Sequence, residues 1–182
     1  LQYTYHNAKN AETFGVELDV KKNLDFIGLR GLSFVCNAAY IYSRVRFEEG
    51  APERDRPLAG QSPYLVNAGF FYQYDDKGIS ASLLYNRIGK RIESVGVPMQ
   101  NQDEDIPDIY EMPRNSLDLT FSKKIGKIVE IKAGIQDILN SKVEYKQFVK
   151  LTDDKGGKSE REQLIRSYRP GVDINIGVSL RF

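Results

Sequence analysis

The sequence contains very few of the residues that build disulfides, metal sites and nucleophilic active sites. It has one cysteine, one histidine and no tryptophan among 182 residues. A single cysteine excludes an internal disulfide, and a cysteine-poor chain fits a protein of the bacterial envelope. Cys36 falls on an apolar face, where we predict a small hydrophobic side chain. His6 has no neighbouring ligands in the sequence, so no metal site is expected there.

Recognisable catalytic motifs are also missing. The chain carries no G-x-S-x-G elbow, no phosphate-binding P-loop and no zinc-ligand spacing. Its histidine and its cysteine lie on different predicted elements, and its paired carboxylates occur only in predicted loops. We therefore predict that the protein is not an enzyme and that it binds no cofactor.

Net charge and long apolar runs are equally scarce. Lys and Arg number 26 against 25 Asp and Glu, which leaves neither an electrostatic footprint for nucleic acid nor a polybasic membrane anchor. The longest apolar runs are too short for a transmembrane helix. A transmembrane β-barrel passes this test, because only alternate residues of its strands face lipid. The sequence shows no export signal, so an exported protein with this sequence would be a mature form or a fragment.

What the sequence does contain is strict alternation, most clearly at its end. Over residues 172–182 every even position is apolar and every odd position is polar, charged or glycine. A period of two places successive side chains on opposite faces of a strand, and the β-branched and aromatic residues favour a strand over a helix. A water-soluble sheet can show the same pattern. The length suffices to cross a bilayer at a tilt, and the final aromatic residue favours the closing strand of an outer-membrane barrel.

The same alternation predicts seven strands. They lie near residues 12–21, 31–47, 64–75, 79–92, 115–124, 127–137 and 168–182. Long connections alternate with short turns, and the last long connection could extend its preceding strand through 143–149. Such alternation is typical of a transmembrane barrel with short periplasmic turns and long outer loops. We therefore predict an all-β fold in which residues 1–182 form one antiparallel transmembrane β-barrel segment.

An odd number of strands bears on how the sheet closes. Complete bacterial barrels have an even number, and seven strands would leave two edges unpaired in lipid, where each unmet backbone group costs on the order of several kcal/mol. The chain is therefore predicted to be the C-terminal portion of a larger barrel. Two alternatives remain open. Residues 1–6 could add an eighth strand and complete a small structural or adhesive barrel, or the apolar face could line a water-soluble lipid-binding barrel.

Four stretches of the chain match a known pattern when they are taken together and in order. They are residues 12–18 (ETFGVEL), 57–64 (PLAGQSPY), 137–140 (DILN) and 178–182 (VSLRF). As a set they resemble the C-terminal barrel region of TonB-dependent outer-membrane receptors, especially those of Bacteroidetes. Each stretch is a weak motif alone, but the four span nearly the whole chain.

The resemblance implies a 22-stranded barrel in the outer membrane of a Gram-negative bacterium, with an N-terminal plug domain that is absent from this sequence. Such receptors capture a scarce nutrient (an iron chelate, a vitamin or a glycan) and import it with energy passed on by TonB. The implied partners are outer-membrane lipid and lipopolysaccharide, the plug and the rest of the barrel, TonB acting through that plug, and the barrel-assembly machinery. No nucleic-acid partner is expected.

Three sets of residues are candidate sites. Val178, Leu180 and Phe182 resemble the terminal signal that the barrel-assembly machinery reads, and they also fit plain lipid-facing positions. The predicted lumen-facing residues are Glu17, Asp19, Asn37, Asn67, Asp118, Glu130, Lys132, Asp173, Asn175 and Arg181. The predicted ligand-side loop residues are Arg54, Arg56, Asp103, Glu104, Asp105, Arg161 and Arg166.

The ligand-side set has two interpretations. Guanidinium groups could bind an anionic ligand or lipopolysaccharide phosphate in a bidentate manner. The acidic residues match no calcium-loop spacing, so no metal is predicted. Both kinds of charge also fit ordinary solvated loops.

Overall fold

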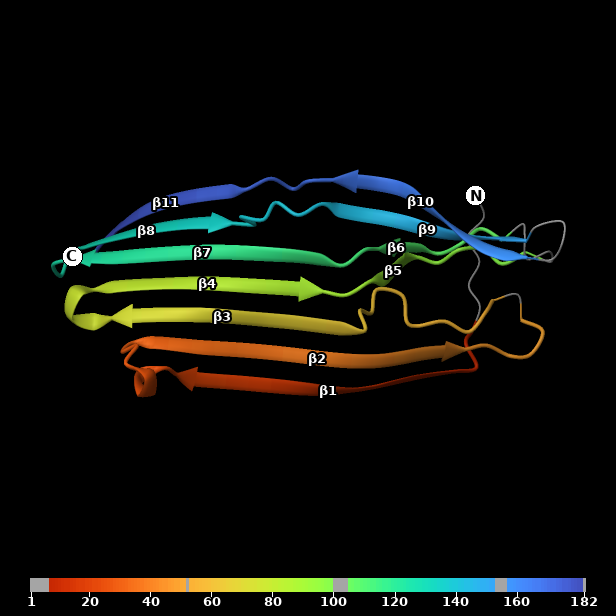
Figure 1. The fold of residues 1–182 in the computed structure, drawn as a ribbon, viewed down its shortest axis with the longest axis horizontal. Helices are drawn as coiled ribbons and strands as arrows, with labels where there is room; N and C mark the ends of the chain where they lie inside the picture. The colour runs from red at the N-terminus through yellow and green to blue at the C-terminus, as the bar shows by residue number, and fades with distance from the viewer. Residues whose placement is uncertain (1–6, 52, 100–104, 153–156, 182) are drawn as a thin grey trace.

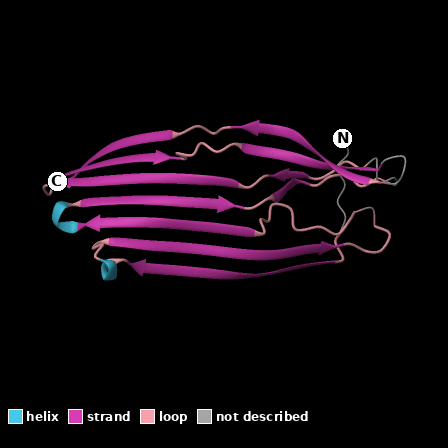
Figure 2. Ribbon diagram, viewed as in Figure 1, coloured by secondary structure: helices cyan, strands magenta, loops and turns pink. Residues whose placement is uncertain are grey.

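A computed structural model describes residues 7–51, 53–99, 105–152 and 157–181. The fold is all-β, with two antiparallel sheets and two short 3-10 turns, η1 (Asp25–Ile27) and η2 (Asp75–Lys77) (Figures 1 and 2). None of the helices in these ranges has the length and apolar character needed to cross a membrane.

The larger sheet has seven strands, and each strand pairs antiparallel with its neighbours. In spatial order they are β1 (Asn10–Asn23), β2 (Leu32–Arg46), β3 (Tyr64–Tyr74), β4 (Ile79–Ile88), β7 (Arg114–Ile125), β8 (Val129–Gln136) and β11 (Asp173–Leu180). These strands lie where the alternation predicts them. Tight connections join them at one end of the sheet, which we call the turn end, and the longer connections lie at the other, which we call the outer end (Figure 1).

The smaller sheet has four strands and continues the larger one at its outer end. Its strands are β5 (Arg91–Ser94), β6 (Ile109–Glu111), β9 (Val143–Thr152) and β10 (Lys158–Tyr168), in the order β10-β9-β6-β5. This repeats the order of β11, β8, β7 and β4, so each strand prolongs a strand of the larger sheet after a short break (Figure 1).

The sequence predicts long connections between the strands 79–92 and 115–124 and between 127–137 and 168–182, and in both the structure has further strands. β5 and β6 are too short to show an alternation, and β10 carries charges on both faces and a bulge between Leu164 and Arg166. The proposed extension through 143–149 does lie within β9.

The register of the seven-stranded sheet gathers the apolar residues on one face. Residues directly opposite each other in antiparallel strands share a face. Val16 thus lies opposite Tyr40, Phe34 opposite Phe70, and Leu83 opposite Leu119. The apolar face comprises Phe14, Val16, Leu18, Val20, Phe34, Cys36, Ala38, Tyr40, Tyr42, Val66, Ala68, Phe70, Tyr72, Ala81, Leu83, Tyr85, Leu117, Leu119, Phe121, Ile131, Ala133, Ile135, Ile174, Ile176, Val178 and Leu180.

This apolar face is open rather than packed against a core. Ile176 is 77% exposed and Val16 is 73% exposed. The few fully buried apolar side chains, such as Ile92 and Val143, lie in the smaller sheet or under the loop that covers the outer end of β2. Soluble monomers rarely expose an apolar surface of this extent, so the face requires an apolar surrounding.

The two edge strands, β1 and β11, are not paired with each other, and the described strands form no closed barrel. An open seven-stranded sheet is the arrangement that the odd strand count predicts for a segment. Residues 1–6, the proposed eighth strand of the alternative small barrel, lie outside the described residues.

Two glycines in the connection between β1 and β2 differ in the space available for a side chain. Gly28 and Gly31 have φ of +84° and +75°, but a Cβ would meet no atom within 4 Å at Gly28 and would lie 2.1 Å from the Gln73 carbonyl oxygen at Gly31. We expect Gly28→Ala to lower the free energy of unfolding by about 1 kcal/mol, and Gly31→Ala by roughly twice as much. Urea unfolding of both variants in detergent micelles measures the difference, and equal losses would contradict the Gly31 contact.

Candidate functional site

The polar face of the seven-stranded sheet carries the predicted lumen-facing residues. The register puts Asp19 opposite Asn37, Asn37 opposite Asn67, and Glu130 opposite Ser179. The remaining members also occupy the alternate positions that point away from the apolar face: Glu17, Asp118, Lys132, Asp173, Asn175 and Arg181, the last just beyond β11. The structure therefore brings all ten to one surface that seven strands share.

Hydrogen bonds between strands cover this polar face. The Asn37 amide donates to Asp19 over 2.7 Å, and Asn86 donates to Asn67. Ser82 and Thr120 share a hydrogen bond of 2.6 Å between their hydroxyls. Polar side chains satisfy each other here without a packed core, which suits a surface that faces water.

The turn end of the polar face carries a small charge cluster. The Glu130 carboxylate lies 3.5 Å from the Lys132 ammonium and 3.7 Å from the Arg181 guanidinium. The amide of Asn175 occupies the space above Gly134, where a Cβ would lie 2.8 Å from its oxygen. Two of the predicted lumen residues, Lys132 and Arg181, therefore share the carboxylate of a third, Glu130.

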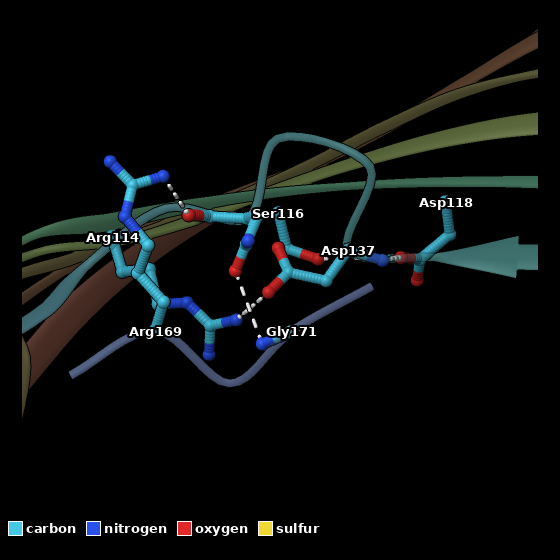
Figure 3. Close-up of polar contacts among 7 residues, drawn as sticks. Arg114, Ser116, Asp118, Asp137, Arg169 and Gly171 are labelled. Atoms are coloured by element: carbon cyan, nitrogen blue, oxygen red, sulfur yellow. Dashed lines mark hydrogen bonds and ion pairs between the residues drawn. The ribbon is translucent and has the colours of Figure 1, made fainter. Parts of the chain in front are cut away.

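A largely buried ion pair lies where β8 ends and the chain turns toward β9 (Figure 3). Asp137 is 9% exposed and has φ of +52°, and its carboxylate pairs with the Arg114 guanidinium. Its backbone N–H donates to the Asp118 carboxylate over 2.8 Å. Asp118 is thus a support for the turn. Asp tolerates positive φ better than most residues, which explains an aspartate at this position.

The same turn is joined to the connection between β10 and β11. Asn140, with φ of +42°, accepts the Gly171 N–H at its side-chain oxygen over 3.1 Å. Its backbone carbonyl accepts from Arg169 over 3.2 Å (Figure 3). The DILN stretch that resembled a family motif is therefore a structural corner. Its partners Arg114 and Arg169 could not be identified from the sequence, because the register brings them there.

Some of the predicted ligand-side residues contact other residues of the chain, and others are exposed to solvent. Arg54 and Asp105 form a bidentate ion pair that links two outer connections, so neither is a free ligand contact. Arg56 forms backbone bonds with Val45 and stacks its guanidinium 5.6 Å from the Phe47 ring. Arg161 is exposed on β10.

Arg166 lies 4.1 Å from the ring centroid of Tyr145 and 5.8 Å from that of Tyr168. Asp103 and Glu104 lie outside the described residues. The predicted ligand-side arginines are therefore spread over the outer end and do not meet in one cluster.

The ion pair between Arg54 and Asp105 depends on pH in a way that can be measured. The Met99 N–H, which donates over 2.7 Å, and then the Arg54 guanidinium hold the pKa of Asp105 below its ordinary value of 3.8. The contribution of the ion pair is therefore complete above pH 3.8 and is lost as the pH falls through the lower folded pKa.

We expect the NMR titration of the Asp105 carboxyl carbon to have a midpoint below 3.8. Arg54→Ala should raise this midpoint only in part, because the Met99 N–H remains, and Arg56→Ala should leave it unchanged. A wild-type midpoint at or above the ordinary value would contradict the ion pair.

A second group on the smaller sheet was not apparent from the sequence. The Lys90 ammonium lies 4.6 Å from the ring centroid of Tyr110 and 4.8 Å from that of Phe148. Burial, followed by the charge of Asp108, raises the pKa of Tyr110. Lys146 lies 2.7 Å from Glu162 and 3.3 Å from Glu144. These residues come from three strands and the connections that flank β5, so no local sequence signal marks them. They give the smaller sheet a mixed-charge surface.

The remaining predicted positions are quickly placed. Cys36 lies on the apolar face, partly exposed, and Val178 and Leu180 lie on the same face of β11. Phe182 and His6 lie outside the described residues. Within the ranges that the structure describes, no three His, Cys, Asp or Glu residues lie close enough together to hold a metal ion.

Comparison with known proteins gives one distant relation. The chain is 25% identical over 152 residues to transferrin-binding protein A of Haemophilus influenzae, a match that covers 76% of this chain and 16% of that protein. The chain thus spans about a sixth of the length of this relative. No protein-family model matches the chain, and no solved structure matches it.

Proposed function

We propose that this chain is a wall segment of an outer-membrane receptor for active nutrient uptake. The observation that carries the proposal is the register of seven strands, which forms one broad apolar face and one broad polar face with no core between them. In a membrane the apolar face contacts hydrocarbon and the polar face contacts water or a plug.

The proposal also orients the chain. Short connections face the periplasm and long ones face outward in bacterial barrels. The outer end, with the smaller sheet and the loop that carries Arg54, then lies outside the cell. The turn end, with η1, η2 and the C-terminus, lies in the periplasm (Figure 1). The smaller sheet extends four of the strands beyond the membrane, where ligand is captured.

The finer features of the proposal rest on the family resemblance. They are a 22-stranded barrel, a plug supplied by other sequence, coupling to TonB, assembly through the terminal strand and an origin among Bacteroidetes. The relative named for binding transferrin supports a receptor for a scarce nutrient. The chain itself supplies barrel wall, water-facing lining and outer hairpins, and we propose no catalytic role for it.

The main alternative is a complete eight-stranded barrel with a structural or adhesive role, which needs residues 1–6 as a strand. A water-soluble lipid-binding barrel would need the apolar face turned inward. The open sheet with two unpaired edges favours the larger barrel over both, because a lipid-exposed edge is costly.

Cell fractionation combined with genetics tests the proposal. The full-length protein should collect in the outer membrane and migrate on SDS gels in a heat-dependent manner. Deleting its gene, or the gene for TonB, should abolish growth on the same member of a panel of ferric chelates, vitamins and glycans offered as sole sources. Recovery in a soluble fraction would contradict the membrane assignment. Growth that depends on the receptor gene but not on TonB would contradict energised uptake.

A further inference from the structure

Arg87 is a charged residue on the apolar face. It is the ninth residue of β4, near the outer end, and lies opposite Val66 on β3 and Asn115 on β7. Leu83 and Tyr85 precede it on the same face. A guanidinium among lipid-facing side chains needs a compensating environment, because arginine at the bilayer midplane costs about 2–4 kcal/mol and near the interface almost nothing.

The neighbours of Arg87 hold it with neutral groups. Its Nε donates to the Tyr64 hydroxyl over 3.2 Å, and its Nη1 donates to the Asn115 side-chain oxygen over 2.8 Å. The Tyr85 hydroxyl donates to the same oxygen over 2.8 Å. The guanidinium carbon also lies 5.9 Å from the Tyr64 ring centroid. The side chain is therefore oriented, but its charge is not neutralised.

Three other arginines at this end are paired with carboxylates. Arg44 pairs with Asp55 at 3.2 Å, Arg46 with Glu12 at 2.8 Å and Arg91 with Glu111 at 2.7 Å. No carboxylate of the described residues lies within ion-pair distance of Arg87. The groups that surround its guanidinium, Tyr64, Tyr85 and Asn115, are all neutral.

Asn115 adds a further donor to this site. Its side-chain oxygen accepts two hydrogen bonds, one from the Tyr85 hydroxyl and one from the Arg87 guanidinium, and this fixes the orientation of the amide. The amide nitrogen of Asn115 is consequently directed away from Arg87 and Tyr85, and it donates to no described residue. The site thus presents a guanidinium charge without a carboxylate partner and an amide donor beside two tyrosine rings.

The depth of the site fits the headgroup layer. Tyrosines concentrate at membrane interfaces, where the ring is apolar and the hydroxyl is wet. Tyr64 begins β3, and Arg87 is followed by only one more residue of β4 before the break toward β5. In the proposed orientation this level is the outer leaflet, whose lipids carry phosphate.

We propose that Arg87, Asn115, Tyr64 and Tyr85 form a binding site for the phosphate of an outer-leaflet lipid headgroup. The proposal rests on the membrane orientation given under Proposed function. The guanidinium and the amide donate to phosphate oxygens, and the two rings pack against the upper part of the acyl chains. A guanidinium fork matches phosphate geometry in a way that a lysine ammonium does not.

Lipid retention by the full-length protein tests the site. The wild type and Arg87→Gln are reconstituted in nanodiscs that contain either diphosphoryl lipid A or only zwitterionic phosphatidylcholine, and bound lipid is counted by native mass spectrometry. We expect Arg87→Gln to bind lipid A about tenfold more weakly, Arg87→Lys to fall between, and Arg91→Gln, which removes a guanidinium already paired with Glu111, to match the wild type.

A second variant tests the site independently, in case Arg87→Gln fails to fold. Asn115→Asp keeps an oxygen acceptor for Arg87 and Tyr85 but places a carboxylate beside the guanidinium, so it should also weaken lipid A binding about tenfold or more. Competition with inorganic phosphate separates the two sources of the same chemistry. Displacement of lipid A by millimolar phosphate would show a free-anion site and overturn the lipid assignment.

Equal retention of lipid A by the wild type, Arg87→Gln and Asn115→Asp in well-inserted protein would overturn the site while leaving the receptor assignment intact. A wild-type chain that fails to enter nanodiscs and stays soluble without detergent would instead overturn the proposed function, and the lipid site with it. The two failures are therefore distinguishable.

Discussion

Replacing Leu119 by arginine is expected to lower the free energy of unfolding from a bilayer by about 2–4 kcal/mol. Leu119 lies near the middle of β7, opposite Leu83 on one side and Ile135 on the other, within the apolar face. An arginine there would stand among apolar side chains far from either end of the strand. Its guanidinium would have to reach the interface or draw water into the hydrocarbon, and both responses are costly.

The adjacent residue provides a matched control. Thr120 follows Leu119 on the same strand but points to the polar face, where its hydroxyl meets that of Ser82 at 2.6 Å. Thr120→Arg introduces the same charge at nearly the same depth. It should lower the free energy of unfolding by no more than about 1 kcal/mol, the contribution of the lost hydrogen bond. Reversible urea unfolding from lipid vesicles measures both variants. A larger loss for Thr120→Arg than for Leu119→Arg would show that the two faces are assigned the wrong way round.

Replacing Asp137 by alanine is expected to reduce the free energy of unfolding by about 3–5 kcal/mol. The change leaves the Arg114 guanidinium without its carboxylate partner in a site where the two side chains are only 27% and 12% exposed. The change also puts a residue that disfavours positive φ at a position where φ is +52°. Both effects act at the corner between β8 and β9.

Asp137→Asn separates the two causes. Asparagine keeps the tolerance for positive φ but loses the charge, so about half of the loss should remain. Glu48→Ala is the comparison for an ordinary ion pair, because Lys9 and Glu48 lie 3.4 Å apart with 56% and 66% of their side chains exposed. It should cost at most about 1 kcal/mol. Chemical unfolding in detergent compares the three, and an Asp137→Ala loss as small as that of Glu48→Ala would contradict a largely buried ion pair.

Much of the fold follows from the sequence because one signal, the period of two, acts over every strand of the larger sheet. Alternation of Val172 to Leu180 or of Leu117 to Phe121 identifies both the strand and its apolar face without any knowledge of the partners. The lumen-facing set followed for the same reason, since Asp19 or Asn175 needs only its own strand to be placed on a face.

What the sequence did not reveal depends on contacts between strands. β6 has only three residues and β10 carries charges on both faces, so neither shows a clear alternation and both resembled loops. Arg54 and Asp105 were candidate ligand-side residues, and no sequence signal indicated that they bind each other across two connections. The hydrogen bonds of Arg87 and the ion pair between Arg114 and Asp137 form only because the register brings residues of β3, β4, β7 and β8 side by side.

The most direct measurement is the accessibility of spin labels along β7. Single cysteines at positions 117, 118, 119, 120 and 121, in a background with Cys36→Ala, are labelled in the vesicle-inserted full-length protein. Collision rates with oxygen, which concentrates in lipid, and with a water-soluble nickel complex are then compared. We expect oxygen to dominate at 117, 119 and 121 and nickel to dominate at 118 and 120. A profile with the opposite phase, or with no alternation, would contradict an apolar face in lipid and a polar face in water.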